Sequence, residues 1–565
     1  MQVPSRCLRI IARKQKLSTS HIHCLKQSTP RSLTPLLFSR CNHHWSIPKG
    51  SSRNTTKVTV AFTVLLGATL CSGSVLNAEA PSEREEDDEP KKTIRLSEVY
   101  KHGENAEEQW VTYKNRVYNI TDWVPAHPGG QVILRAAGGA IDKYWDIFTI
   151  HKNKDVHEIL ETYFIGQVDP QDLDENGRVP AKELDDPFKT DPERSSNFTV
   201  HTPRPFNGEP PMEALMSFIT PNDMFYIRNH LWVPSQKELN SQKLTVELPD
   251  GSEKFYTVEE LKNKFKPTKI TATMQCSGNR RSHMSAEARP AAGLPWDIGA
   301  ISTSTWTGVR LRDILDDAGF PADDWPEDIQ HVQFSGAEAY GASIPIDKAM
   351  SRHGDVIVAY EMNDASIPLD HGYPLRVIVP GHVAARSVKW VNRIVPSSEE
   401  STAQWQRRDY KCFGPNVSGK EADWESAHAI QEMPVQSAIL SLRDVSTHSA
   451  KDRALLQVYG LEEDSVVIEG YAFAGGGRDI VRVDVSANDG RTWHQAEILD
   501  DKALGHKRWA WRRWRFVLPR SQAGRMFTVK AVDQAYNTQP GEYESYYNFK
   551  GNLTNSWHRV GYRTS

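Results

Sequence analysis

An acidic, proline-containing segment divides this 565-residue chain into two parts. Residues 169–196 read DPQDLDENGRVPAKELDDPFKTDPERSS, with few apolar side chains and no clear helical or strand period. A segment of this composition cannot bury enough apolar surface to fold alone, so it is typical of an extended linker. The chain must therefore fold as a small module before this segment and a larger part after it. We assign residues 170–200 as a flexible hinge.

Cysteine usage excludes a fold held together by disulfide bonds. Four of the six cysteines lie in the first 71 residues, and only Cys276 and Cys412 follow. Two cysteines cannot form a disulfide framework, so the folded parts must be stabilised by ordinary cores. The length leaves room for about three domains. The net charge of -4 argues against a general nucleic-acid binder.

The first 78 residues have the composition of a targeting signal. No Asp or Glu precedes Glu79, and the segment is basic and rich in Ser and Thr, which is typical of a mitochondrial presequence. The apolar stretch 58–76 suits a membrane span of about 17–25 residues, so a permanent anchor is the alternative. We interpret residues 1–78 as a targeting and sorting segment for the mitochondrial intermembrane space, in contact with membrane only during import. Residues 79–93 form an acidic lead-in.

Residues 94–169 carry two histidines that suit a haem site. Residues 111–120 have the alternation of a short hairpin, and DWVPAHPGG then places His127 on a sharp turn. His151 follows an aromatic-rich stretch. Two neutral imidazoles on opposite walls of an apolar pocket can take both axial positions of a haem iron, which leaves no open position for oxygen. His157 is the alternative second ligand, and otherwise we expect it on an exposed helix face.

The sequence WVPAHPGG, with the hairpin before it and the second histidine after it, closely resembles cytochrome b5. The resemblance implies one b-type haem per chain, with His127 and His151 as axial ligands to its iron and electron transfer as its role.

Cys276 lies in QCSGNRR, between the alternating residues 269–274 and the pair Arg280 and Arg281. It could be a buried structural thiol, a nucleophile or a metal ligand. The two arginines favour a thiolate. No Cys-x-x-Cys or Cys/His quartet accompanies it, which argues against a structural zinc site. One soft thiolate could instead complete the coordination of a metal whose other sulfur ligands come from a cofactor.

The region 201–411 has a mixed α+β pattern. Apolar runs predict strands at 243–248, 269–274, 331–336, 355–360 and 374–379. Helices are predicted at 257–265 and 310–319. These alternating elements predict a mixed sheet with helices packed on it.

The region 412–565 has the pattern of a β-sandwich. Short alternating strands are separated by Gly, Asn and Asp turns. The stretch 508–516, RWAWRRWRF, could suggest nucleic-acid binding, but one face of a sandwich strand is apolar in any case, and we prefer that interpretation. The fold class is therefore multidomain α+β, with a small haem module, a mixed α+β domain and a C-terminal sandwich.

Several motifs together resemble the animal sulfite oxidase family: FYIRNH (225–230), QCSGNRR (275–281), GAISTSTWTGVRLRDIL (299–315), AYGASIPI (339–346), DHGYPLRVIVPGH (370–382) and WQRRDYK (405–411). The resemblance runs from about Ile94 to the C-terminus and includes the order of the domains. It implies a molybdenum–molybdopterin cofactor, one per chain, with Cys276 as the protein ligand to molybdenum. It also implies an immunoglobulin-like C-terminal domain that forms a homodimer.

The resemblance assigns roles to further residues. Those that would bind the cofactor are Tyr226, Ile227, Arg228, Asn229, His230, Cys276, His371, Arg376, Ser387, Val388 and Lys389. Those that would surround the substrate beside the metal are Arg228, Arg281, Trp296, Tyr410 and Lys550. Lys550 stands where the family has arginine, and lysine keeps the charge but lacks the planar fork that makes a bidentate anion contact. An acidic cofactor contact is placed only loosely, at Glu338, and Cys412 is interpreted as a packing residue.

The implied activity is oxidation of sulfite to sulfate, with electrons passed singly through the haem to cytochrome c. Two alternatives remain at this stage. One is a nitrate-reductase-like enzyme, although such enzymes place the haem module after the molybdenum domain and add a flavin domain. The other is a haem electron carrier without enzymatic activity, whose central domain is a scaffold.

Overall fold

The protein is described here by a computed structural model that covers residues 92–124, 127, 130–148, 151, 154–180, 186–337, 340–500 and 507–563. The predicted targeting segment 1–78, nearly all of the acidic lead-in and Glu338 lie outside these residues. Within the described ranges, no helix has the length and apolar character needed to cross a bilayer.

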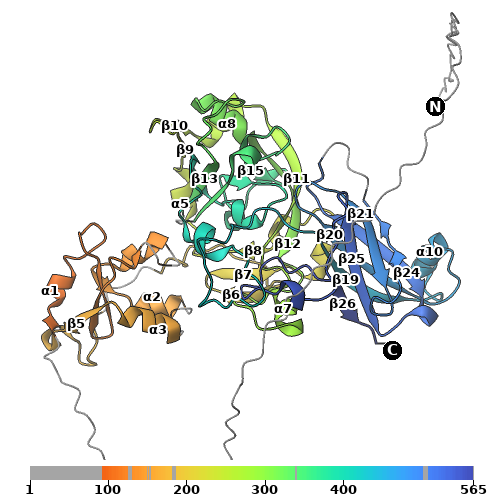
Figure 1. Cartoon of the computed structure of the whole chain (residues 1–565), viewed down its shortest axis with the longest axis horizontal. Coiled ribbons are helices and arrows are strands. Elements are labelled where there is room, and N and C mark those ends of the chain that lie inside the picture. Colours follow the sequence, from red (N-terminus) through yellow and green to blue (C-terminus); the bar gives the residue numbers. More distant parts are fainter. Residues whose placement is uncertain are drawn as a thin grey trace, which may run out of the picture. The chain divides into compact units, whose positions relative to one another are not determined.

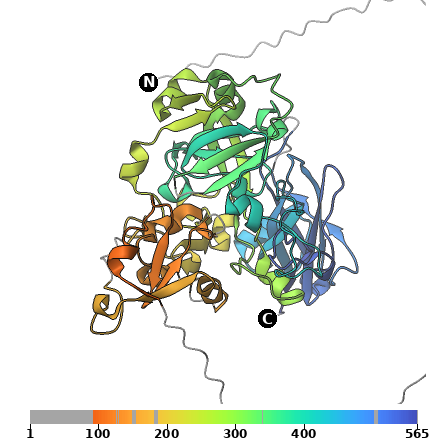
Figure 2. The same ribbon diagram turned by 60° about the vertical axis from the view of Figure 1, so that its left-hand side comes forward.

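Residues 93–168 form a small mixed sheet with short helices, drawn in orange in Figures 1 and 2. Its strands, in spatial order, are β1 (Thr93–Ile94), β5 (Phe164–Val168), β3 (Arg116–Asn119), β2 (Trp110–Tyr113) and β4 (Gly139–Ala140). The helices are α1 (Leu96–Val99), η2 (Gly130–Ala136), α2 (Asp142–Ile147) and α3 (Lys154–Glu161). The antiparallel pair β2–β3 confirms the hairpin predicted for 111–120.

Both ends of the predicted hinge make contacts in the structure. Asp172 accepts two hydrogen bonds of 2.8 Å from the Arg95 guanidinium, and Val179 is buried in the apolar cluster of the small module. Further along, Arg194 donates to Asp370 of the central domain. These contacts restrict the predicted hinge of residues 170–200, and its flexibility stays a prediction.

The central domain contains three sheets. The first has the order β10 (Glu253–Tyr256), β9 (Leu244–Glu247), β18 (Val391–Ser397), β13 (His331–Gly336) and β14 (Gly341–Pro345). The second joins β11 (Thr268–Gln275), β12 (Ile301–Arg310), β15 (Ile357–Met362) and β16 (Ala365–Ser366), with β17 (Arg376–Ile378) on β15. The third consists of β6 (Thr199–Pro203), β7 (Phe206–Glu209) and β8 (Ile227–Arg228). All five strands predicted here are therefore confirmed.

Short helices pack around these sheets. They are α4 (Met212–Leu215), α5 (Gln236–Asn240), α6 (Val258–Lys264), α7 (Arg281–Glu287), α8 (Leu311–Ala318) and α9 (Ile346–Met350). The two helices predicted from sequence are α6 and α8. The start of α6 is fixed by a capping box, in which the Thr257 side chain accepts from the Glu260 N–H and Glu260 accepts from the Thr257 N–H.

The C-terminal domain is a sandwich of two four-stranded sheets, drawn in blue in Figure 1. One contains β19 (Gln436–Val445), β20 (Ser465–Phe473), β24 (Arg512–Pro519) and β23 (Glu497–Ile498). The other contains β22 (His494–Gln495), β21 (Ile480–Ser486), β25 (Met526–Asp533) and β26 (His558–Gly561). The helix α10 (Ala450–Val458) connects β19 to β20. The multidomain α+β fold predicted from the sequence is thus confirmed.

The basic and aromatic stretch 508–516 belongs to this sandwich. Trp514 of β24 is fully buried between the sheets. Its arginine neighbours form ion pairs with carboxylates, among them Arg512 with Asp479 and Arg515 with Glu469. Buried tryptophan and paired arginine agree with the structural interpretation of this stretch.

His382 gives the fold a dependence on pH. Burial, together with the nearby charges of Lys348 and Arg386, lowers the pKa of His382 to about 3. The unfolded chain takes up a proton at this imidazole near pH 6.5, whereas the folded protein does so only near pH 3. The free energy of unfolding should therefore fall by up to about 1.4 kcal/mol per pH unit as the pH decreases from about 6.5 to about 3.

Replacing this histidine should flatten that decline. Urea denaturation at pH 7 and pH 5 should show a smaller difference for His382→Gln than for the unsubstituted protein. His353→Gln, at an exposed position, is the control. Equal differences in all three proteins would show that His382 does not contribute.

Candidate molybdenum and haem sites

Cys276 directly follows strand β11 at the start of a tight turn. Its N–H donates to Ala300 O of the neighbouring chain segment at 2.9 Å, which continues the pairing of β11 with β12. The turn ends at Arg280, which has a positive φ of 65°, and α7 then begins at Arg281. The pairing of the strand thus fixes the backbone of Cys276, and the turn places its side chain at the end of the sheet.

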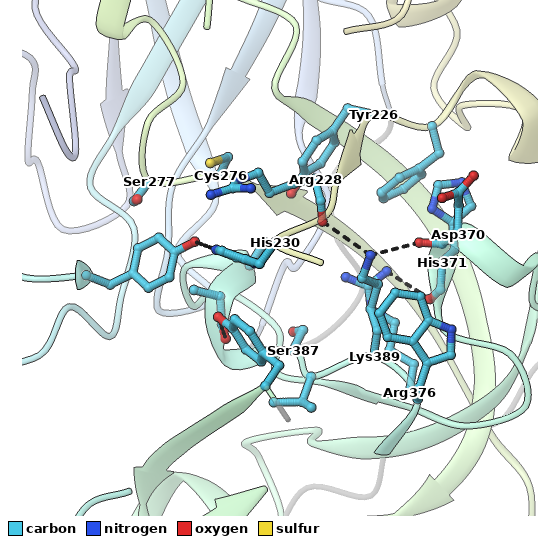
Figure 3. A pocket seen from close by; sticks show the side chains of 17 residues that line it. Tyr226, Arg228, His230, Cys276, Ser277, Asp370, His371, Arg376, Ser387 and Lys389 are labelled. Carbon is cyan, nitrogen blue, oxygen red and sulfur yellow. Dashed lines mark hydrogen bonds between the residues drawn. The ribbon is translucent and has the colours of Figure 1, made fainter. Parts of the chain in front are cut away.

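The thiol of Cys276 lies at the wall of a cavity, shown in Figure 3. Segments far apart in sequence build this cavity: β8, the turn after β11, η6 (Leu369–His371), β17, the residues after η7 (Ala384–Arg386) and the end of η8 (Trp405–Asp409). The predicted residues that line it are Tyr226, Arg228, His230, Cys276, His371, Arg376, Ser387, Val388, Lys389 and Tyr410. Phe225, Ser277, Tyr340, Asp370 and Trp390 also line it and were not predicted.

Three cationic side chains face the cavity. Figure 3 shows Arg228 beside Cys276 and Lys389 across the cavity from it. Lys389 Nζ donates to Arg228 O at 3.2 Å and to Asp370 O at 3.0 Å. Arg376 donates to a backbone carbonyl through Nη1, but its buried Nε has no partner among the described residues. The cavity is therefore suited to an anionic group, because cations line it and a buried donor is left without an acceptor.

Burial raises the pKa of the Cys276 thiol, while Arg228, Arg281 and the N–H of Gly278 oppose that rise. Without a bound metal the buried sulfur is therefore a protonated thiol, and it becomes a thiolate when a metal takes the place of the proton. A single soft sulfur beside a cationic cavity fits an anionic cofactor that brings a metal with it.

Tyr410 and His230 form a hydrogen-bonded pair beside the thiol. The Tyr410 hydroxyl and His230 Nε2 are 2.8 Å apart and share a hydrogen bond. Burial and the charges of Arg228 and Lys389 hold the pKa of His230 well below its usual value, so the imidazole is neutral. The tyrosine follows a five-residue π-helix, a rare element that often occurs at functional sites.

Asp409 is a partly buried carboxylate that was not predicted from the sequence. Its side chain pairs with Lys550 Nζ at 2.6 Å. Burial acts to raise its pKa, but Lys550, Arg228 and Arg281 outweigh burial and hold the pKa below the usual range. Lys550 is therefore neutralised by a partner, and it does not line the cavity.

Several other predicted site residues do not line the cavity. Arg281 is buried and donates to three acceptors, Lys550 O and Leu294 O at 2.8 Å and Asn552 Oδ1 at 3.3 Å. Trp296 is 1% exposed and packs in the same apolar cluster as Cys276, with its ring 4.8 Å from that of His201.

Ile227 and Asn229 alternate with the lining residues of β8 and do not face the cavity. Cys412 is partly buried, and its Sγ lies 4.0 Å from Asn552 O, as expected of a packing residue.

The C-terminal sandwich fixes the turn after Cys276. Asn279 Nδ2 donates to the Tyr471 hydroxyl at 3.1 Å, and that hydroxyl donates to Ile298 O at 2.9 Å. Ser277 Oγ donates to Asn552 Oδ1 at 2.8 Å. The thiol is thus positioned by contacts from two domains.

The two histidines of the small module face each other. The rings of His127 and His151 are 6.2 Å apart between centroids and 5° from parallel. Two metal–nitrogen bonds of about 2 Å each account for about 4 Å of this distance, and the rest matches the two half-rings. His151 Nδ1 lies 3.1 Å from Phe148 O, a group that can only accept, so Nδ1 carries the proton and Nε2 keeps a lone pair. The geometry fits a metal between two imidazoles.

His157 does not have this arrangement. It lies on α3 with its ring 4.9 Å from Trp145 and 5.6 Å from Tyr113, and it is partly buried. The expectation of an exposed helix face was therefore wrong, because this face of α3 packs on aromatic side chains.

Three families match the chain, in the order of its modules. Residues 95–169 match the Cytochrome b5-like Heme/Steroid binding domain, residues 230–405 the Oxidoreductase molybdopterin binding domain and residues 427–565 the Mo-co oxidoreductase dimerisation domain. Fold and sites together define an oxidoreductase that uses molybdopterin and haem. The third match supports the predicted homodimer.

Relatives are similar over most of the chain. The sulfite oxidase of Gallus gallus is 44% identical over 475 residues, which cover 82% of this chain and 98% of that protein. The mitochondrial sulfite oxidase of Homo sapiens is 42% identical over 461 residues, covering 80% and 81%. The chain belongs to the sulfite oxidase family. A nitrate reductase [NAD(P)H] of Hordeum vulgare is 35% identical over 373 residues, covering 63% of this chain but 40% of that protein.

The contact between Tyr471 and the turn can be tested. Tyr471→Phe leaves the buried Asn279 amide and Ile298 carbonyl without this partner, at a cost of about 1–3 kcal/mol in the free energy of unfolding. Molybdenum content should fall as well, because the turn that positions Cys276 is loosened.

Urea denaturation and metal analysis measure the two effects. Tyr459→Phe is the control, since that hydroxyl bonds to Glu497 on the surface of the same domain. A Tyr471→Phe protein with unchanged stability and full molybdenum content would contradict the expectation.

Proposed function

We propose that this chain oxidises sulfite to sulfate at a molybdenum–molybdopterin centre bound by Cys276, and passes the electrons singly through a b-type haem to cytochrome c. One observation carries the proposal: a buried thiol lies at the wall of a cavity with Arg228 and Lys389, in a chain that also holds the parallel rings of His127 and His151. Membership of the sulfite oxidase family supports sulfite as the substrate.

The cavity suits a small dianion. Sulfite carries two negative charges, and Arg228 lies beside the thiol with its Nη1 held by Asn207 Oδ1 at 3.1 Å and Asn229 O at 2.6 Å. Cationic side chains with fixed orientation raise the local concentration of an anion and orient it for reaction. Tyr410 adds a neutral hydroxyl to the wall of the same cavity. Arg281 does not contact the anion directly and instead supports the turn after Cys276. Trp296 packs in the same apolar cluster as Cys276.

The reaction converts sulfite and water into sulfate, two protons and two electrons. The molybdenum centre, when bound, supplies the two-electron redox chemistry and the oxygen transfer. The protein binds the anion at Arg228 and keeps Tyr410 protonated, since burial raises the pKa of this phenol well above its usual value. The Asp409–Lys550 pair contributes no net charge, so a bidentate anion contact at Lys550 is not part of this proposal.

His127 and His151 are assigned as the axial ligands of the haem iron. A haem whose iron is held by two protein side chains would transfer electrons and would not bind oxygen. A one-electron acceptor must follow, and we assign this role to cytochrome c. Relatives that are named mitochondrial support a mitochondrial location for this protein. The basic N-terminal segment and the apolar stretch 58–76 are the reason that we propose the intermembrane space as the compartment.

Two alternatives are disfavoured. A nitrate-reductase-like enzyme shares the molybdenum and haem modules, but here the haem match, 95–169, precedes the molybdopterin match, 230–405. A haem carrier with an inert central domain would contain no molybdenum.

Addition of sulfite to the purified protein without oxygen tests the proposal directly. The haem absorption bands should change to those of the reduced form, with one sulfate formed per two electrons. Nitrate used as the oxidant in place of cytochrome c would support the first alternative. A haem that stays oxidised in protein with full molybdenum content would overturn the proposal.

Replacement of Cys276 by serine should abolish sulfite oxidation and leave the haem spectrum unchanged. The reason is that a hard hydroxyl is a poor ligand for this metal in place of thiolate. Cys412→Ser is the matched control, as the second described cysteine packs away from the cavity. Turnover of the Cys276→Ser protein near the unsubstituted rate would exclude the ligand role.

Substitutions can distinguish the proposed haem ligand His151 from the nearby His157. His151→Ala should lose the low-spin haem spectrum and the reduction of cytochrome c, while sulfite oxidation with an artificial acceptor at molybdenum should remain. His157→Ala removes an aromatic packing contact and should keep the spectrum. The reverse pattern, with His157 required and His151 dispensable, would move the second ligand to His157.

A further inference from the structure

Arg194 connects the end of the linker to the wall of the cofactor cavity. Its Nε and Nη2 donate to the two carboxylate oxygens of Asp370 at 2.8 and 2.9 Å. The two side chains are only 11% and 8% exposed. Arg194 lies between the matched haem and molybdopterin domains, in residues that neither match includes.

Asp370 belongs to the cavity itself. It lines the cavity next to His371, and its Oδ1 also accepts from Asn229 Nδ2 at 2.9 Å. Lys389 donates to the backbone carbonyl of the same residue at 3.0 Å. Burial acts to raise the pKa of Asp370, but Arg194 and Lys389 outweigh burial and keep the group ionised.

A carboxylate is unexpected in the wall of a cavity for an anionic cofactor. The phosphate of molybdopterin and a charged Asp370 repel each other unless a cation compensates the carboxylate. Arg194 provides this compensation with two of its three hydrogen bonds, and it does so from outside the cavity, where it does not occupy cofactor space. The bidentate pair also fixes the orientation of the carboxylate, which in turn holds Asn229.

Residues 186–198, here called the anchor segment, are tied to the central domain by further contacts. Asp191 accepts from Arg194 at 2.8 Å and from the N–H of Val233 at 3.0 Å. Phe198 packs with Phe206 in a small apolar cluster. The anchor segment is thus part of the domain that binds the cofactor, although its composition resembles that of the linker before it.

We propose that Arg194 is a positioning residue for the molybdenum cofactor: by neutralising and orienting Asp370 it allows the anionic cofactor to be retained, and it couples the seating of the anchor segment to cofactor binding. The proposal rests on molybdopterin as the cofactor of the proposed function, and it is independent of sulfite as the substrate.

Coupling of this kind is reciprocal. If a seated anchor segment favours the cofactor, the bound cofactor favours the seated segment by the same free energy. The segment should therefore exchange its amide hydrogens more slowly in cofactor-loaded protein than in full-length protein from a host unable to make molybdopterin. Equal exchange in 186–198 in the two forms would overturn the coupling.

The experiment measures cofactor retention rather than turnover. Purified Arg194→Gln protein is incubated, and released molybdopterin is quantified by the fluorescence of its oxidised pterin, with molybdenum measured in parallel. The variant should lose cofactor roughly 10- to 30-fold faster than the unsubstituted protein, the effect expected of one uncompensated charge in the cavity wall at an intermediate dielectric constant. Arg204→Gln is the matched control, because it removes the exposed ion pair with Asp186 in the same segment and should change retention less than twofold.

A second substitution separates charge compensation from a structural role. Asp370→Asn removes the carboxylate charge that Arg194 compensates, so Arg194→Gln/Asp370→Asn should retain cofactor to within about threefold of the unsubstituted protein. Arg194→Lys should lie between the two, as it keeps the charge but lacks the planar fork.

Retention by Arg194→Gln equal to that of Arg204→Gln, or loss in the double variant as fast as in Arg194→Gln, would overturn the proposal. If Arg194→Gln does not accumulate as folded protein, Arg194→Lys and Arg194→Lys/Asp370→Asn make the same comparison. A full haem spectrum and an unchanged circular dichroism spectrum establish folding in each case.

Discussion

The buried guanidinium of Arg280 holds the metal-binding turn to the C-terminal sandwich. This side chain is fully buried and donates to Gln436 Oε1 at 2.8 Å, to Ser556 O at 2.7 Å and to the Tyr543 hydroxyl at 2.8 Å. Removal of a guanidinium from water is costly unless its donors are satisfied, so these acceptors fix its place. They also hold Arg280 at positive φ, a conformation that an L-residue adopts only when its surroundings impose it. The direction of the neighbouring Cys276 side chain depends on this arrangement.

The charges around the cavity follow one pattern. Two carboxylates, the buried Asp370 and the partly buried Asp409, lie among the cations, and each is paired with a cation from a distant part of the chain, Arg194 and Lys550. These cations offset the charge of the carboxylates. The positive potential that remains comes from side chains that face the cavity, such as Arg228. In a medium of low dielectric constant this separation concentrates the field where an anion binds.

Local signals made most of the fold predictable from the sequence. Apolar runs predicted β11 and β13, and the helix predicted at 257–265 is α6. The family motifs identified most residues that line the cavity. They also suggested that Trp296 surrounds the substrate, whereas Trp296 does not line the cavity and packs in the same apolar cluster as Cys276. A motif fixes identity and spacing but not the direction in which a loop side chain points.

Contacts between residues far apart in the chain could not be predicted from local sequence patterns. Asp370 and Asp409 stand inside recognised motifs, yet their importance comes from Arg194 and Lys550, which are 176 and 141 residues away. The π-helix before Tyr410 has no periodic signature over its five residues. The anchor segment was likewise not predicted, because its polar composition is that of a linker. It is held by ion pairs and hydrogen bonds more than by apolar burial.

The contacts of the turn after Cys276 have a consequence for the order in which the protein is made. Every residue assigned to cofactor binding lies before residue 390, whereas the partners of Arg280 extend to Trp557. A ribosome therefore completes all the ligands long before it completes the groups that orient them. Cofactor insertion is in this respect an event for the finished chain. A protein shortened by its last twenty residues would keep each of those ligands and still lack a formed site.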